Sequence, residues 1–336
     1  MQVQENFSLR KYNTFGIDAK AARFAAFRDQ MQLAALLDLI QDRPFMVLGG
    51  GSNLLLTGDV NGFVLKNECK GIKLVGEDED HVYVRAGAGE NWHQFVLHCI
   101  ANNRAGVENL SLIPGCVGAS PMQNIGAYGV EIKDVFHELR AYHVADRVVH
   151  TFDLSQCEFG YRESVFKRKY KGQYIILDVT FRLRKRPIFN TSYGAIEEEL
   201  AKMGIKEPSI RAISDAVIRI RSSKLPDPAQ IGNAGSFFKN PSVSAEKFAK
   251  LQQHFPKIVG YKNDDGSIKL AAGWLIEQCG WKGFRDGDAG VHAKQALVLV
   301  NYGAAKGAEI YALSEKILVS VLEKFGVELE REVNVV

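Results

Sequence analysis

The chain of 336 residues is 46% hydrophobic and 24% charged, which is the composition of a globular protein with two or three domains and a sizeable core. Its formal net charge of +3 is too small to indicate a nucleic-acid-binding protein, and its short basic run at 182–186 ends a predicted strand. The sequence shows no internal repeat and no low-complexity segment, which excludes repeat architectures.

Hydrophobic periodicity predicts an α/β unit at the start of the chain and an α+β region after it. The elements of the first unit are strands at 23–27, 45–48 and 63–65 and a helix at 31–40. The elements of the second region, which begins near residue 71, are strands at 72–76, 81–86, 139–144, 148–152 and 174–183 and a helix at 91–102. The third and fourth of these strands are expected to form a hairpin about Asp146. Alternation over 174–183 indicates a strand with one buried face.

A helix over 209–221 is expected to connect this region to a third one. The elements of the third region are helices at 244–254, 271–279 and 308–325 and a strand at 296–301. The longest helix has an apolar stripe that predicts a side facing the core. The stripe consists of Ile310, Leu313, Ile317, Val321 and Leu322. Alternation over 327–336 predicts a last strand that rejoins the second region.

Targeting and metal-binding signals are weak throughout. No apolar run approaches the roughly 18 residues of a membrane span, and the start MQVQENFSLRK lacks the hydrophobic core of a secretory signal. We therefore expect a cytoplasmic protein that binds neither a membrane nor nucleic acid. The five cysteines lack C-x-x-C spacing and the eight histidines lack H-E-x-x-H spacing, which predicts reduced thiols and no metal site.

Two glycine-rich segments carry the strongest functional signal. They are LGGGSNLL at 48–55, which leaves a predicted buried strand, and IPGCVGASPMQNIGAYG at 113–129. Glycine lets successive main-chain N–H groups converge on an anion such as a pyrophosphate, although each segment by itself also fits an ordinary tight turn. Neither is a P-loop or a Rossmann fingerprint. From the residues alone, the prediction is a ligand that carries phosphate.

The chain also resembles a known family, the UDP-N-acetylenolpyruvoylglucosamine reductases of peptidoglycan synthesis. The resemblance covers nearly the whole chain and rests on eight segments in the right order. These are 48–55, GAGENWH at 87–93, 113–129, GYRESVFK at 160–167, RSSKLPDP at 221–228, GNAGSFFKNP at 232–241, HAKQALVLVN at 292–301 and LEREV at 329–333.

The resemblance implies an α+β fold and bound FAD. The implied parts are a two-part FAD-binding module of the vanillyl-alcohol-oxidase/p-cresol-methylhydroxylase (PCMH) type and a smaller α+β substrate-binding domain. The implied boundaries are 1–70 for the first FAD-binding subdomain, 71–213 with 326–336 for the second, and 214–325 for the substrate-binding domain. The implied cofactor-binding residues are Gly49, Gly50, Gly51, Ser52, Asn53, Pro114, Gly115, Gly118, Ser120, Gln123, Asn124, Gly126 and Arg221.

The implied reaction takes hydride from NADPH, through the flavin N5, to the enolpyruvyl group of UDP-N-acetylglucosamine enolpyruvate, giving UDP-N-acetylmuramate. Negative charge develops beside the substrate carboxylate, so a cation, an acid and a proton donor are needed. The resemblance assigns proton donation to Ser236 and charge stabilisation to Arg162 and Glu332. Without the resemblance, these residues would be interpreted as a turn serine, a solvated charge and a solvent-facing carboxylate.

The resemblance further implies contacts with the UDP-sugar substrate. The residues concerned are Tyr193, Lys224, Asn240 and Gln295. The segment around Tyr193 is similar to a tyrosine lid found in one subclass, although a surface tyrosine is an equal alternative. The chain departs from the family at Asn334, where an arginine is usual, which puts one flavin or substrate contact in doubt.

Two other functions remain open, an FAD oxidase of a hydroxy acid or alcohol on the same fold and a nucleotide-sugar-binding protein without turnover. Ser236 and Glu332 argue against both. An oxidase would consume oxygen with its alcohol substrate, and a binding protein would show no bleaching of a flavin by NADPH. We expect a monomer with a small-molecule substrate.

Overall fold

The computed structural model describes residues 2–192 and 195–336. The chain forms two compact units. Unit 1 comprises Met1–Phe7, Ala21–Gly50 and Asn61–Ser223, and unit 2 comprises Ser8–Lys20, Gly51–Val60 and Lys224–Val336. The three-part division into flavin and substrate domains stays a prediction, because compactness alone does not assign a function to a segment.

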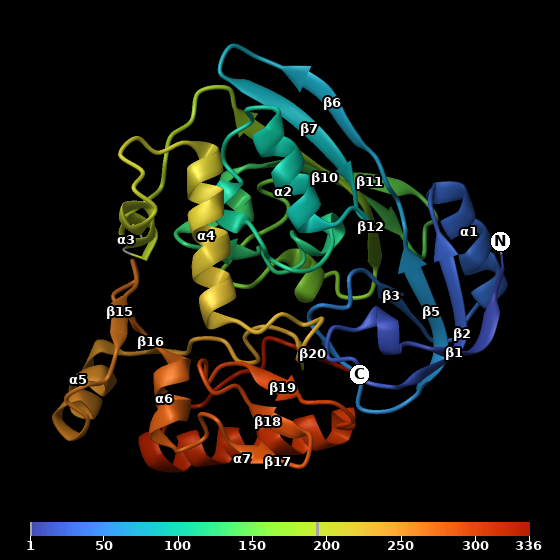
Figure 1. The fold of residues 1–336 in the computed structure, drawn as a ribbon. Coiled ribbons are helices and arrows are strands. Elements are labelled where there is room, and N and C mark those ends of the chain that lie inside the picture. Colours follow the sequence, from blue (N-terminus) through green and yellow to red (C-terminus); the bar gives the residue numbers. More distant parts are fainter. Residues whose placement is uncertain (1, 193–194) are drawn as a thin grey trace. The chain divides into compact units, whose positions relative to one another are not determined.

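The first sheet has four strands in the order β1-β2-β5-β3 (Figure 1). They are β1 (Gln4–Ser8), β2 (Lys20–Phe27), β5 (Val60–Asn67) and β3 (Phe45–Leu48), of which β3 and β5 are parallel. Helix α1 (Gln30–Ile40) starts at Asp29, whose side chain accepts the N–H of Gln32 as an N-cap. Its buried leucines pack with Phe27 and Phe63 in one cluster. The predicted α/β unit is confirmed.

The second sheet of unit 1 has five antiparallel strands in the order β11-β10-β12-β7-β6. They are β6 (Ile72–Glu77), β7 (His81–Gly87), β10 (Phe136–His143), β11 (Val149–Asp153) and β12 (Tyr174–Arg184). Helix α2 (Trp92–Ala101) is capped by the Asn91 side chain and covers one face of this sheet (Figure 1). Its aromatic residues Trp92 and Phe95 contact Phe181 of β12. The predicted strands, hairpin and helix are confirmed.

The prediction of one buried face for the strand at 174–183 was wrong, because β12 is buried on both faces. Ile176 and Val179 belong to the cluster under α2, whereas Ile175 and Leu177 belong to the cluster that includes α1. A strand between two apolar layers has no solvent-facing side, so alternation along its sequence does not indicate which one of its faces is buried.

Unit 1 ends with the helix pair α3 (Ala195–Lys202) and α4 (Ile210–Lys224), although Lys224 itself belongs to unit 2. Apolar residues of both helices form one small cluster that includes Ile196 and Ile213. The predicted helix at 209–221 is confirmed. The short elements of unit 1 are β8 (Gly126–Ala127), β9 (Val130–Glu131) and the 3-10 helices Glu108–Leu110, Val117–Ala119, Ile132–Asp134 and Val165–Lys167.

Unit 2 contains three small sheets and three helices. The strands are β13 (Gly232–Asn233), β17 (Arg285–Asp286), β18 (Ala289–Val291) and β19 (Leu299–Asn301) in one sheet, β14 (Ser242–Val243), β15 (Gly260–Lys262) and β16 (Ile268–Leu270) in another, and β4 (Leu54–Leu55) with β20 (Asn334–Val335) in the third. The helices are α5 (Ala245–His254), α6 (Ala272–Gln278) and α7 (Gly307–Phe325), with a 3-10 turn at Arg10–Tyr12. Helix α7 lies against β18 and β19 (Figure 1). The four predicted elements of this region are confirmed.

Two details of unit 2 differ from prediction. Leu322 is 45% exposed, and the buried stripe of α7 runs instead through Ile310, Ser314, Ile317, Val321 and Phe325, because steps of three or four residues follow one helix face. The predicted final strand is shorter than expected. It pairs in parallel with β4 and not with the five-stranded sheet. Beyond this pairing, the N–H of Thr57 donates to the carbonyl of Val336 at 2.6 Å.

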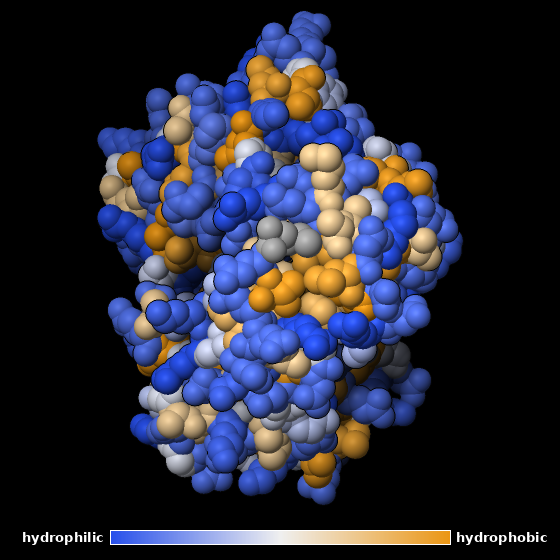
Figure 2. All heavy atoms as spheres, turned by 90° about the vertical axis from the view of Figure 1, so that its right-hand side faces the viewer, coloured by the Kyte–Doolittle hydropathy of each residue, from blue (hydrophilic) through white to orange (hydrophobic). Residues whose placement is uncertain are grey.

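In the part of the chain that the structure describes, no helix is long and apolar enough to span a membrane. Hydrophobic residues on the face drawn in Figure 2 form patches separated by hydrophilic residues. Among residues 2–192 and 195–336, no group of three His, Cys, Asp or Glu side chains is arranged to hold a metal ion.

Candidate functional site

Gly50, in the first glycine-rich segment, packs directly against the second segment within unit 1. An ideal Cβ on Gly50 would lie 2.7 Å from the Cα of Gly115, closer than real Cβ atoms approach main-chain atoms. The carbonyl of Gly49 accepts a hydrogen bond of 2.5 Å from Lys66 Nζ on β5. The two segments therefore meet only because residue 50 has no side chain.

Main-chain hydrogen bonds fix the second segment to residues 88–92. The N–H of Trp92 donates to the carbonyl of Gly115 at 3.0 Å, and the N–H of Val117 donates to the carbonyl of Glu90 at 2.8 Å. The motif GAGENWH and the glycine-rich segment thus form one hydrogen-bonded frame. This frame gives a physical reason for finding both motifs in the same chain.

Main-chain amides at the junction of the two segments are available to a ligand. Among the described residues, none accepts a hydrogen bond from the N–H of Gly49, Gly50 or Gly115, and all three glycines are half-buried. Unpaired amides that are shielded from water are destabilising unless a ligand or water accepts from them. A diphosphate supplies several acceptor oxygens, so the junction fits the anionic part of a dinucleotide.

We expect Gly50→Ala to lower both flavin occupancy and stability. Its Cβ must push the backbone at Gly115 away, and overpacking of this kind costs about 1–3 kcal/mol. Gly49→Ala is the matched control, since its Cβ would meet nothing nearer than the Cβ of Cys116 at 3.9 Å. The measurement is the melting temperature of each deflavinated variant. Equal melting temperatures for the two variants would contradict the packing argument.

Two residues expected at the cofactor use their side chains inside the protein. The buried Ser120 donates its hydroxyl to the carbonyl of Val117 at 2.7 Å. Asn124 Nδ2 donates to Glu131 and to the carbonyl of Gly160, both at 3.0 Å, and its Oδ1 accepts a main-chain N–H at 3.1 Å. These side chains hold the shape of the segment. The other predicted cofactor residues in this segment are Pro114, Gly115, Gly118, Gln123 and Gly126.

Arg162 also lies against the second segment. Its Nη2 donates to the carbonyl of Gly126 at 2.7 Å, and its guanidinium carbon lies 5.3 Å from the centre of the Tyr161 ring. Its φ of 55° is uncommon for a residue with a side chain, and such conformations persist where surrounding contacts hold them. The arginine is therefore held in a defined position beside the segment.

Arg221, on α4, is a cation that burial disfavours. Burial lowers the pKa of its guanidinium, while the Tyr128 phenol hydrogen-bonds to it, and no described carboxylate pairs with it. A half-buried guanidinium in these surroundings fits an anionic ligand. No sequence pattern predicted a role for Tyr128 or His93, although both lie in segments that carry the family resemblance.

In unit 2, the end of the first glycine-rich segment is tied to the last residues of the chain. Asn53 Nδ2 donates to the carbonyl of Glu332 at 3.1 Å, and Asn334 donates to the carbonyl of Asn53 from its N–H at 3.1 Å and from its Nδ2 at 3.0 Å. The amide of Asn334 thus has a structural partner at the position where an arginine was expected. Gly51 and Ser52, also predicted at the cofactor, belong to this segment.

Ser236 and Glu332 lie on paired main-chain segments of unit 2. The N–H of Glu332 donates to the carbonyl of Phe237 at 2.9 Å, and Phe238 pairs antiparallel with Arg331. Phe237 and Phe238 are buried, which fixes the segment that carries the exposed Ser236. The structure brings these two predicted catalytic residues onto neighbouring, hydrogen-bonded segments, whereas Arg162 belongs to unit 1.

Two of the predicted substrate-binding residues meet at the start of α6. Asn240 Oδ1 accepts the N–H of Ala272 at 3.0 Å, and Gln295 Oε1 lies 3.0 Å from an ideal Cβ on Gly273. Lys224 is exposed at the end of α4. Tyr193 lies outside the described residues.

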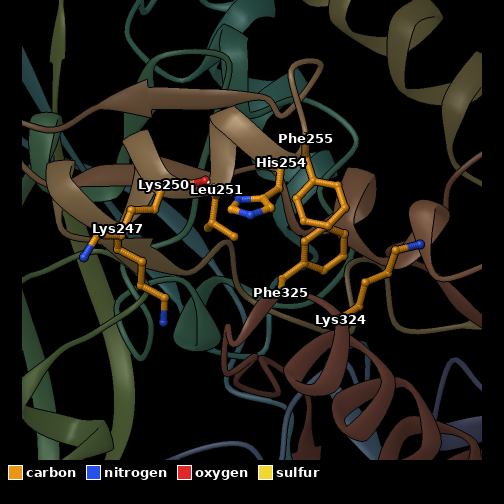
Figure 3. Close-up of a pocket in the computed structure, with 7 residues that line it drawn as sticks. All are labelled: Lys247, Lys250, Leu251, His254, Phe255, Lys324 and Phe325. Atoms are coloured by element: carbon orange, nitrogen blue, oxygen red, sulfur yellow. Dashed lines mark hydrogen bonds between the residues drawn. The ribbon is translucent and has the colours of Figure 1, made fainter.

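A separate pocket of about 370 Å³ lies between the ends of α5 and α7 (Figure 3). It contains none of the predicted site residues. The Phe255 and Phe325 rings form one wall. Lys247 Nζ and Lys324 Nζ bind the carbonyls of Gly326 and Gln278, both at 2.5 Å, and Lys324 Nζ lies 5.8 Å from the centre of the Phe325 ring. Because these ammonium groups neutralise helix ends and do not converge, we assign the pocket no ligand.

Comparison with known proteins decides the family. Residues 21–151 match the FAD binding domain, and residues 227–336 match the C-terminal domain of UDP-N-acetylenolpyruvoylglucosamine reductase. The reductase of that name from Pseudomonas syringae pv. tomato is 52% identical over 336 residues, covering 99% of each chain. The chain belongs to the UDP-N-acetylenolpyruvoylglucosamine reductase family. The reductase from Flavobacterium johnsoniae is 50% identical over 337 residues and covers 100% of both chains.

A solved structure of a family member agrees with this assignment. The reductase from Thermus caldophilus is 25% identical, covers 100% of this chain and 99% of its own, and superposes with a TM-score of 0.70. The fold is thus α+β, with an FAD-binding domain and the C-terminal domain of the reductase family. The FAD-binding match includes both glycine-rich segments but excludes Arg162 and Arg221.

Proposed function

We propose that this protein reduces the enolpyruvyl group of UDP-N-acetylglucosamine enolpyruvate to UDP-N-acetylmuramate in peptidoglycan synthesis, with FAD as cofactor and NADPH as hydride donor. The observation that carries the proposal is identity of about half the residues over the whole chain with reductases of that name. The main-chain N–H groups of Gly49, Gly50 and Gly115, which donate to no described residue, support the cofactor assignment independently, because they suit a diphosphate.

The residues that would hold FAD are those of the two glycine-rich segments, with Arg221 beside them. When bound, FAD accepts a hydride and passes it on, which no amino-acid side chain of this chain can do. Gly50 and Gly115 would bind the diphosphate through their main-chain N–H groups. Ser120 and Asn124 would act through the shape of the loop, since their polar atoms already have protein partners.

Arg162 and Glu332 would stabilise the negative charge that develops on the substrate. Addition of hydride to the methylene carbon forms a C–H bond, and the electron pair of the double bond moves toward the carbon that bears the carboxylate. A guanidinium at a fixed position lowers the energy of this charge without reorganising. Ser236 would then donate its hydroxyl proton to that carbon, which completes the saturated ether.

The substrate contacts remain proposals as well. Lys224 would bind the UDP diphosphate through its charge, while Asn240 and Gln295 would bind the sugar nucleotide near the start of α6. Tyr193 would close over the substrate, as in the subclass with a tyrosine lid. We also propose the three-part domain division given above, a monomeric state and a cytoplasmic location.

The colour of the purified protein tests the proposed function directly. We expect a yellow protein whose flavin absorbance bleaches with NADPH and returns when UDP-N-acetylglucosamine enolpyruvate is added under argon. The control is the same nucleotide sugar without the enolpyruvyl group, which should restore no colour. Rapid oxygen consumption with a hydroxy acid would indicate an oxidase, and a colourless protein that binds UDP-sugars would indicate a binding protein.

A further inference from the structure

Leu112 has an unusual backbone immediately before the second glycine-rich segment. Its φ is 58°, in the left-handed region that residues with a Cβ rarely adopt. It is followed by Ile113, Pro114 and Gly115, so its conformation sets the direction in which the segment leaves. A residue with a strained backbone at this point needs surrounding contacts that hold it in that conformation.

Side chains from two different helices bind the main-chain polar groups of Leu112. The N–H of Leu112 donates to His93 Nδ1 on α2 at 2.9 Å, and the carbonyl of Leu112 accepts from Arg221 Nε on α4 at 3.3 Å. Neither bond belongs to a helix or a sheet. Leu112 is therefore clamped between α2 and α4 by side chains alone.

The bond to His93 specifies the protonation state of the imidazole. Because Nδ1 accepts an N–H, it carries no proton, and the ring is neutral with its proton on Nε2. Burial, and secondly the charge of Arg221, lower the pKa of His93 and favour this neutral form. The positive charge of Arg221 therefore favours the neutral imidazole that the hydrogen bond from Leu112 requires.

Further bonds tie α4 to both ends of the segment. Ser111 and Ser214, both fully buried, share a hydrogen bond of 2.8 Å between their Oγ atoms. At the other end, the Tyr128 side chain hydrogen-bonds to the same Arg221 that holds Leu112. The carbonyl of Tyr128 accepts from Asn109 Nδ2 at 2.9 Å. The two ends of the segment thus share one anchor on α4.

We propose that His93 is a positioning residue for the cofactor, which, together with Arg221, holds Leu112 in its left-handed conformation and so preorganises the glycine-rich segment to receive FAD. The inference rests on the proposed function in so far as FAD is the ligand of this segment. A segment that is already in its bound shape loses less conformational entropy on binding. Loss of the clamp is therefore expected to weaken FAD binding although His93 need not touch the cofactor.

Two substitutions that introduce an amide side chain at His93 distinguish the position of the hydrogen-bond acceptor from the mere presence of a polar group. In His93→Asn the side-chain oxygen is attached to Cγ, as Nδ1 is in histidine, whereas in His93→Gln it lies one carbon further out. We expect the Kd for FAD of the deflavinated full chain to rise roughly ten-fold in His93→Gln and less than about three-fold in His93→Asn. Titration of intrinsic fluorescence with FAD measures both values.

A second substitution tests the backbone strain itself. Glycine adopts the left-handed region without a penalty, so Leu112→Gly should restore part of the FAD affinity in the His93→Gln background. Equal Kd values for His93→Asn and His93→Gln, or no recovery with Leu112→Gly, would overturn the clamp. Failure of the proposed function would look different, because the unchanged protein itself would then bind no FAD.

Discussion

Ser236→Ala is expected to leave bleaching of the holoenzyme by NADPH nearly unchanged and to slow its reoxidation by the enolpyruvyl substrate about 10²–10⁴-fold. The hydroxyl is the proposed source of the proton, which only the second half-reaction needs. Anaerobic stopped-flow absorbance in single turnovers separates the two half-reactions.

The surroundings of Ser236 make this variant interpretable. The adjoining segment is held by main-chain bonds, from the N–H of Phe237 to the carbonyl of Leu297 at 2.8 Å and from Glu332 to Phe237 at 2.9 Å. Removal of one exposed hydroxyl leaves these bonds intact. Ser236→Cys, which keeps an ionisable proton, should recover part of the rate. If both half-reactions slowed equally, Ser236 would have no role as proton donor.

Arg162→Leu should reduce the rate of the same second half-reaction about 10²–10³-fold, the effect typical of removing one preorganised donor to a developing charge. Arg162→Lys keeps the charge but loses the planar fork, so an intermediate rate is expected. The measurement is again reoxidation by substrate in a single turnover. The hydrogen bond from Arg162 to the carbonyl of Gly126 fixes the guanidinium and explains why position matters as well as charge.

Arg168→Leu is the control for general loss of positive charge in this region. Arg168 directly follows the segment 160–167, is itself exposed, forms an ion pair of 3.6 Å with the half-buried Glu163, and has no proposed contact with the substrate. Exposed pairs of this kind contribute about 0–1 kcal/mol to stability, so we expect near-normal kinetics. Reoxidation at a normal rate in Arg162→Leu, or equal slowing in both variants, would remove Arg162 from the proposed mechanism.

Local patterns were sufficient to predict most elements of this fold. Helices α1, α2 and α7 have strong periodicity, and each begins within about two residues of the position that the sequence indicates. The second buried face of β12 could not be predicted, because it depends on α1 and β5, which lie more than a hundred residues earlier in the chain.

The site was predictable in part, and for a different reason. The family segments predict Ser236 and Glu332 as catalytic residues, and their roles stay predictions, yet the antiparallel pairing between 237–239 and 330–332 is a long-range contact that no local pattern encodes. Ser120 and Asn124 lie in the expected segment but use their side chains for internal bonds. His93 was missed because its function depends on the backbone of Leu112, which becomes visible only in three dimensions.

The burial of β12 on both faces has a consequence for how unit 1 opens. Ile176 and Leu177 are neighbours in sequence, but each belongs to a different apolar cluster, so β12 packs against both clusters. If β12 separates from one cluster, the other cluster is exposed to water as well. Thermal motion that releases the part containing α1 therefore also loosens the part containing α2, and unit 1 responds to heat or denaturant as one cooperative block.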